Sequence, residues 1–170
     1  MGSKAAVEIR TLKPFKTYHD RNVIEKVVLL MDSQLRSFID GLQTSTPLQT
    51  VELWILGLEN RSGAVQHAVL SLALQKRTQK QFVESNWITG QSSPWVSNIH
   101  IVHVNKISET TQQFTLAYDL ITSYANFGKG HKVITVEKNP EPGRENWFIT
   151  KISTTSLPYE AITPAEMINK

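Results

Sequence analysis

The segment Phe114-Thr115-Leu116-Ala117-Tyr118-Asp119-Leu120 decides the fold class of this chain. Its large apolar side chains occupy every second position, and this period of two predicts a strand with one face on a hydrophobic core. Residues 98–107, 131–138 and 147–153 have a similar strand-like composition. We therefore expect the second half of the chain to form an antiparallel sheet of about four strands.

The first half of the chain has the spacing of helices. Asn22 and Glu25 have the form of a capping box, and apolar residues three and four positions apart continue to Leu42, which predicts a long amphipathic helix. Thr46 and Pro47 suit the first positions of a second helix. We expect that helix to end near residues 61–63, with Gly63 in the left-handed conformation. Residues 64–70 and a segment from residue 71 predict shorter helices.

Together these elements predict an α+β fold in which N-terminal helices pack on a strongly bent antiparallel sheet. The alternation changes phase between Ile101 and Val102, and such a change predicts either a bulge, which would bend the sheet, or a strand that is buried on both faces. We expect a hairpin turn at residues 107–111 and a longer one at residues 124–130. The domain should span residues 20–156, after a basic lead-in or stem over 1–19 and before a C-terminal tail over 157–170.

Composition excludes several kinds of site and partner. The 170-residue chain has no cysteine, so it has no disulfide, no thiolate nucleophile and no cysteine metal ligand. Its formal net charge is only +3, and acidic residues interrupt the lysines of the strands, which argues against nucleic-acid binding. No apolar run of about 18 residues occurs, so we expect no direct membrane insertion. A missing membrane anchor before the basic lead-in is an open alternative.

A long first helix, two shorter ones and a strongly bent antiparallel meander over residues 22–153 resemble the nuclear transport factor 2-like superfamily, which has a cystatin-like α+β cone. A narrower resemblance rests on short segments: Trp54 with residues 61–64, Trp87-Ile88-Thr89-Gly90, Ser92-Ser93-Pro94-Trp95-Val96 and residues 147–152. They are similar to exported or lipoprotein domains of Gram-positive bacteria, most of which have no assigned activity. The resemblance implies a pocket inside the cone and an extracytoplasmic, membrane-anchored location.

The residues that could line such a pocket are aromatic side chains and one histidine: Trp54, His67, Trp87, Trp95, Tyr118 and Trp147. Large aromatic residues also fill helix-to-sheet cores, and we expect this role for Trp54 and Trp147. His67 lies among apolar neighbours and is expected to be a packing residue. Trp87 and Trp95 flank a loop of glycine and serine, so they are the candidates to border an opening.

The sequence offers no set of catalytic residues and no cofactor motif. His100 and His103 lie three apart, which places them on opposite faces of a regular strand, although a bulge could bring them together. Metal binding would still need a third ligand, so we predict no metal site. No acidic residue occupies an inward position of a predicted strand, which disfavours acid–base catalysis in a cavity.

Two functions therefore remain as hypotheses. The first is a non-catalytic extracytoplasmic module that binds a partner protein or a small apolar ligand, or serves as a scaffold. The second is a small-pocket enzyme of isomerase or hydrolase type. An inward carboxylate or histidine in the cavity would favour the enzyme. Self-association through the sheet, giving a homodimer, is a further expectation.

Overall fold

A computed structural model describes residues 44–140, 145–155, 157 and 159–167, all within one compact unit. The expected helix over residues 22–42 and the basic lead-in lie outside the described residues. The helices are α2 (Pro47–Glu59), α3 (Gly63–Ala68), α4 (Leu72–Glu84) and α5 (Pro164–Met167). The strands are β1 (Trp95–Lys106), β2 (Thr111–Ile121), β3 (Asn126–Lys138) and β4 (Trp147–Thr155).

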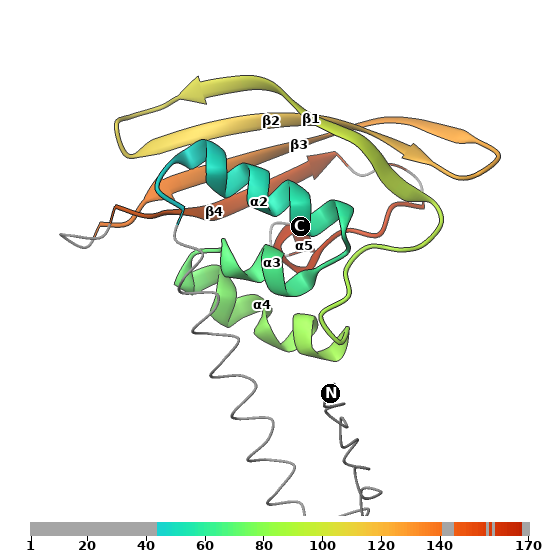
Figure 1. Ribbon diagram of the computed structural model, residues 1–170, viewed down its shortest axis with the longest axis horizontal. Coiled ribbons are helices and arrows are strands. Elements are labelled where there is room, and N and C mark those ends of the chain that lie inside the picture. The colour runs from blue at the N-terminus through green and yellow to red at the C-terminus, as the bar shows by residue number, and fades with distance from the viewer. Residues whose placement is uncertain (1–43, 141–144, 156, 158, 168–170) are drawn as a thin grey trace, which may run out of the picture. The chain divides into compact units, whose positions relative to one another are not determined.

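The helices and the sheet form two layers. The four strands pair antiparallel in the order β1-β2-β3-β4, and Figure 1 shows the helices on one face of this sheet. The α+β prediction is therefore confirmed. The sheet is open and not strongly curled, so the expected cone is not confirmed.

Side-chain caps set the starts of the three longer helices. Thr46 accepts a hydrogen bond from the backbone N–H of Gln49, and Pro47 occupies the first turn, as predicted. Ser62 and Ser71 cap α3 and α4 in the same way, so the two short helices predicted after α2 are also confirmed. Each cap satisfies one backbone donor that the helix itself leaves without a partner.

The prediction that Gly63 adopts the left-handed conformation is wrong. Arg61 takes that role with a φ of 55°, while Gly63 is the first residue of α3. A Cβ at Gly63 would lie 2.9 Å from the carbonyl oxygen of Trp87 and 2.8 Å from the Phe82 ring. Glycine is needed there because two backbone segments approach closely, and Gly63 N donates to Trp87 O at 2.7 Å.

The core lies between α2 and the inward face of the sheet. The alternating residues Phe114, Leu116, Tyr118 and Leu120 are all buried, as the period of two predicts. Their neighbours on β3 and β4 are Ile134, Val136, Ile149 and Ile152, and Trp54 of α2 packs in the same cluster. The inward face is thus continuous across the three strands.

Register irregularities occur in all three strand pairs. The β1–β2 pairing shifts between Ile101 and His103, which confirms the predicted bulge. The predicted turn over residues 124–130 is wrong, because β3 already begins at Asn126. Gly128, with a φ of 115°, lets the strand continue through a backbone conformation that other residues rarely adopt.

Replacing Trp147 with alanine should lower the free energy of unfolding by about 3 to 5 kcal/mol, because the indole is 7% exposed and lies in the main core cluster. Urea unfolding measures this change. Leu72→Ala is the matched control, since Leu72 is 64% exposed and its truncation should change stability by about 0.5 kcal/mol or less. Equal effects of the two substitutions would contradict the core assignment.

Candidate functional site

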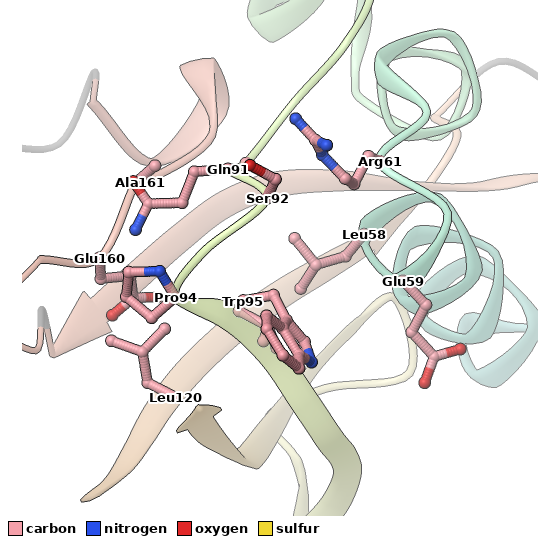
Figure 2. A pocket seen from close by; sticks show the side chains of 12 residues that line it. Leu58, Glu59, Arg61, Gln91, Ser92, Pro94, Trp95, Leu120, Glu160 and Ala161 are labelled. Atoms are coloured by element: carbon pink, nitrogen blue, oxygen red, sulfur yellow. The ribbon is translucent and has the colours of Figure 1, made fainter. Parts of the chain in front are cut away.

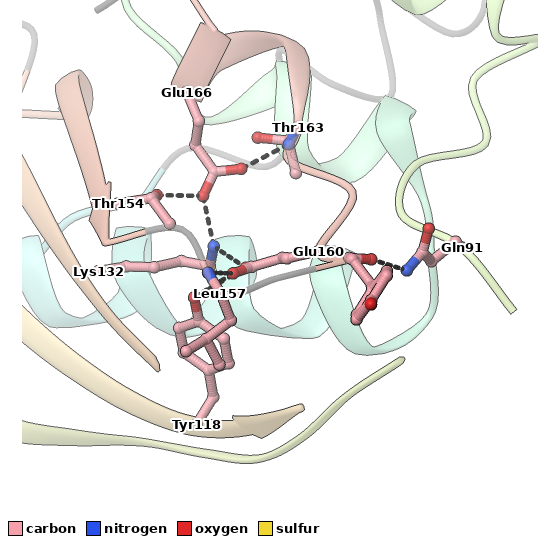
Figure 3. Close-up of polar contacts among 9 residues, drawn as sticks. Gln91, Tyr118, Lys132, Thr154, Leu157, Glu160, Thr163 and Glu166 are labelled. Carbon is pink, nitrogen blue, oxygen red and sulfur yellow. Dashed lines mark hydrogen bonds and ion pairs between the residues drawn. The ribbon is translucent and has the colours of Figure 1, made fainter. Parts of the chain in front are cut away.

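A buried ionic cluster joins the C-terminal segment to the sheet. Lys132 Nζ of β3 lies 2.9 Å from Glu160 Oε1 and 2.6 Å from Glu166 Oε1. All three side chains are only 1% exposed. Figure 3 shows the two carboxylates approaching the ammonium group from the segment that ends in α5. We call Lys132, Glu160 and Glu166 the buried ionic cluster.

Hydrogen bonds occupy the remaining positions on both carboxylates. Tyr118 Oη donates to Glu160 at 2.7 and 2.8 Å, and the backbone N–H of Leu157 donates to Glu160 Oε2 at 3.1 Å. Glu166 accepts from Thr154 Oγ1 at 2.6 Å and from the backbone N–H of Thr163. Burial of charge is tolerated when each charged group is paired and hydrogen-bonded in this way.

The register of β2 and β3 places the aromatic ring and the lysine together. Tyr118 pairs with Gly130, so Lys132 lies two residues further along β3 on the same inward face. A Cβ at Gly130 would lie 2.3 Å from Tyr118 Cζ, so only glycine leaves room for the ring. Lys132 Nζ lies 4.7 Å from the ring centroid, which adds a cation–π contact.

Burial raises the pKa of the Tyr118 phenol well above its ordinary value, and the hydrogen bond and negative charge of Glu160 raise it further. The phenol is therefore held as a hydrogen-bond donor at neutral pH. Its proton points at a carboxylate that the ammonium group of Lys132 also contacts.

A pocket of about 270 Å³ lies beside this cluster, where the end of α2, the segment before β1 and the C-terminal segment meet (Figure 2). Its apolar lining residues include Leu58, Pro94, Trp95, Val96 and Leu120. Its polar lining residues are Glu59, Arg61, Gln91, Ser92 and Glu160. Known ligand sites combine apolar walls with a few polar groups in this way, and this volume lies at the small end of their range.

The backbone around Arg61 positions its side chain at the pocket. Arg61 Nε donates to the carbonyl oxygen of Thr89 at 3.2 Å, and Thr89 N donates to the carbonyl oxygen of Arg61 at 3.1 Å. Thr89 is itself fixed because its hydroxyl accepts from Gln66 Nε2 at 2.7 Å. The loop before β1 and the end of α2 are thereby tied together.

Of the predicted pocket residues, Trp95 alone lines this pocket directly. Tyr118 reaches Glu160, which lines it, so Tyr118 lies behind the pocket wall. Trp54 and Trp147 belong to the core, as expected. Trp54 is 0% exposed, which leaves no surface for a ligand.

His67 and Trp87 belong to an aromatic cluster away from the pocket. The rings of His67 and Phe82 have centroids 5.3 Å apart, as do those of His67 and Trp87, and Trp87 stacks on Phe82 at 5.7 Å. His67 is 8% exposed, in agreement with its expected packing role. The expectation that Trp87 borders the opening is not met by the described pocket.

The bulge in β1 brings His100 and His103 to one face of the sheet. They pair with Ala117 and Thr115, which lie two apart on β2 and therefore share a face, opposite to the face that carries Leu116 and Tyr118. Within the described part of the chain, no group of three histidine, aspartate or glutamate side chains is placed to hold a metal ion.

Sequence reasoning missed Lys132, Glu160, Glu166 and Arg61. The one available signal was Lys132, which occupies an inward position between Gly130 and Ile134 in an otherwise apolar alternation. A lysine at such a position needs a buried carboxylate. The carboxylates lie 28 and 34 residues further along the chain, in a segment without apolar periodicity, so the sequence did not reveal the pairing.

Comparison with known protein families, curated proteins and solved structures found no match for this chain. Among the described helices, none has the length and hydropathy needed to span a membrane.

Replacing Lys132 with methionine should lower the free energy of unfolding by about 3 to 5 kcal/mol, because two buried carboxylates would lose their cation. Lys106→Met is the matched control, since its pair with Glu109 is exposed and contributes less than about 1 kcal/mol. Chemical unfolding measures both. Comparable losses in the two variants would contradict a structural role for the buried ionic cluster.

The stability of the protein should also depend on Tyr118 at high pH. Because folding raises the pKa of this phenol, its contribution to stability is complete below about pH 10, the unfolded value, and is lost as the pH rises above it. Tyr118→Phe should therefore lose less stability between pH 9 and about 11 than the wild type. Tyr124→Phe, at a side chain 99% exposed, is the control. The same alkaline loss in all three proteins would disprove this assignment.

Proposed function

We propose that this chain is a non-catalytic binding module that uses the pocket beside Trp95 to hold a small ligand or a short segment of a partner protein. The observation that carries this proposal is the composition of the pocket. Apolar side chains line much of the pocket, together with Arg61. Of its two acidic lining residues, Glu59 and Glu160, Glu160 is already paired with Lys132. Such a site can bind and orient a ligand, but it offers no unengaged acid–base pair.

A small-pocket enzyme is the second candidate, and one observation favours it. Glu160 brings a carboxylate to the pocket wall, in contact with the phenol of Tyr118 and the ammonium group of Lys132. The side chain of Glu160 is nevertheless only 1% exposed and accepts hydrogen bonds from three groups. A general acid or base must reach the proton that it transfers, and these contacts hold Glu160 in a structural role.

The setting proposed for the module is extracytoplasmic, in a membrane-anchored or lipoprotein parent from a Gram-positive bacterium. This part of the proposal rests on the similarity of the motifs around Trp54, Trp87 and Trp95 to exported or lipoprotein domains of Gram-positive bacteria within the nuclear transport factor 2-like superfamily. The order of helices followed by a β1-β2-β3-β4 meander is compatible with it. Register irregularities in each strand pair would supply the bending that a cone requires.

Self-association through the sheet is proposed as a secondary property of the same module. The outward face of β1 and β2 carries His100, His103 and Thr115, and Val102 of β1 is 50% exposed. Strand β1 is also an edge strand of the sheet, with one side free to pair among the described residues.

Binding at this pocket can be tested by NMR with a mixed library of small aromatic and aliphatic compounds, both charged and neutral. We expect chemical-shift changes for residues 90–96 and unchanged compounds after prolonged incubation. Trp95→Ala should weaken binding at least about tenfold, because it removes a large apolar contact surface.

Trp87→Ala serves as the control, since Trp87 lies in the aromatic cluster with His67 and Phe82 rather than in the pocket. It should leave ligand affinity unchanged even if it lowers stability. If the protein chemically converts a library compound, and Glu160→Gln abolishes that conversion, the enzyme hypothesis replaces the binding-module hypothesis. Absence of any binding at residues 90–96 would contradict the proposed function.

A further inference from the structure

The charge of Arg61 is not neutralised within the described part of the chain. The ion pairs described there involve the lysines Lys80, Lys106, Lys132 and Lys138, and no carboxylate lies at ion-pair distance from Arg61. Its fixed contact is the hydrogen bond from Nε to the carbonyl oxygen of Thr89. The guanidinium group is therefore oriented by a neutral acceptor and retains its full positive charge.

The side chain of Arg61 is part of the pocket lining. Figure 2 shows the side chain of Arg61 extending towards Ser92, at the same side of the pocket as Gln91. Because Nε is engaged with Thr89, the two terminal nitrogens can donate to a ligand. Two parallel donors of this kind match the two oxygens of a carboxylate.

The opposite side of the pocket suits an apolar group. Leu58 of α2, Trp95 of β1 and Leu120 of β2 converge there. Figure 2 places the indole of Trp95 and the side chain of Leu58 next to one another, below the guanidinium in this view. A flat apolar group of a ligand packed against Trp95 would bury apolar surface of both the ligand and the indole.

The acidic residues of the pocket limit the charge that a ligand can carry. Glu59 and Glu160 both line it, and of these two only Glu160 forms an ion pair with Lys132. A phosphate monoester, with a charge near −2, would meet stronger repulsion from these carboxylates than a group of charge −1. Figure 2 shows the Glu59 carboxylate directed away from Arg61, with Leu58 between them, so one small anion can approach the guanidinium.

We propose that this pocket binds a monocarboxylate through Arg61, with the apolar group of the same molecule packed against Trp95. The inference rests on the proposed function, because it names the class of ligand for that site. The carboxylate can come from a free aromatic acid or from the C-terminus of a peptide, and the guanidinium contact is the same for both.

The first experiment compares benzoate with benzamide, which has nearly the same shape and no charge. NMR titrations of the whole chain should show benzoate binding at residues 90–96 at least about tenfold more tightly than benzamide. Arg61→Gln should abolish that preference, so that benzoate binds no more tightly than benzamide. Residual binding of both compounds at residues 90–96 then shows that the variant pocket is intact.

Arg77→Gln is the matched control, because Arg77 is an exposed arginine of α4 and does not line the pocket. It should retain the full preference for benzoate. A tripeptide ending in phenylalanine, with a free or an amidated C-terminus, tests the second source. Tighter binding of the free-acid peptide than of benzoate identifies a peptide C-terminus, and the reverse identifies a free acid.

Equal affinities of benzoate and benzamide for the wild type would overturn the carboxylate assignment and leave the binding module in place. A preference for benzoate that survives in Arg61→Gln would also overturn it. If neither compound nor any member of the mixed library shifts residues 90–96, the proposed function itself fails, so the two failures can be distinguished.

Discussion

The pairing of Lys132 with Glu160 and Glu166 is the interaction on which the C-terminal part of the structure depends. A lysine on the inward face of β3 would be strongly unfavourable without carboxylates, because burial removes the ammonium group from water. The segment after β4 supplies both carboxylates, and these ion pairs hold it on the sheet together with its own apolar contacts to the core. Tyr118, Thr154 and backbone donors then complete the coordination of each carboxylate oxygen.

This pairing also shapes the pocket. Glu160 and Ala161 form part of its wall, and the carbonyl oxygen of Tyr159 accepts a hydrogen bond from Gln91 on the opposite segment. The wall is therefore built by a segment that the buried ionic cluster and apolar contacts with the core hold in place. Because Glu160 belongs to both the cluster and the wall, binding at the pocket and docking of the C-terminal segment are physically coupled.

The parts of the fold that were predicted correctly from the sequence depend on residues close together along the chain. The alternation through Leu116, Tyr118 and Leu120, the cap at Thr46 and the bulge near Val102 each depend on residues within a few positions of one another. The prediction for Gly63 was wrong because glycine is needed there for a different reason. The backbone of Trp87, in a distant segment, lies so close that a side chain would not fit. Arg61 took the left-handed conformation instead, and this places it at the pocket.

The sequence by itself determined the α+β class, the order of helices and strands, and the burial of Trp54 and Trp147, because periodicity and capping are local properties of the chain. Only the tertiary structure decided which charged residues meet. Glu160 and Glu166 lie in a segment without periodicity, and their partner Lys132 is separated from them by a whole strand and a connection. Ion-pair partners have no fixed separation along the chain, so a sequence pattern does not reveal them. The site formed by Arg61, Trp95 and Glu160 exists only because the fold brings three distant segments together.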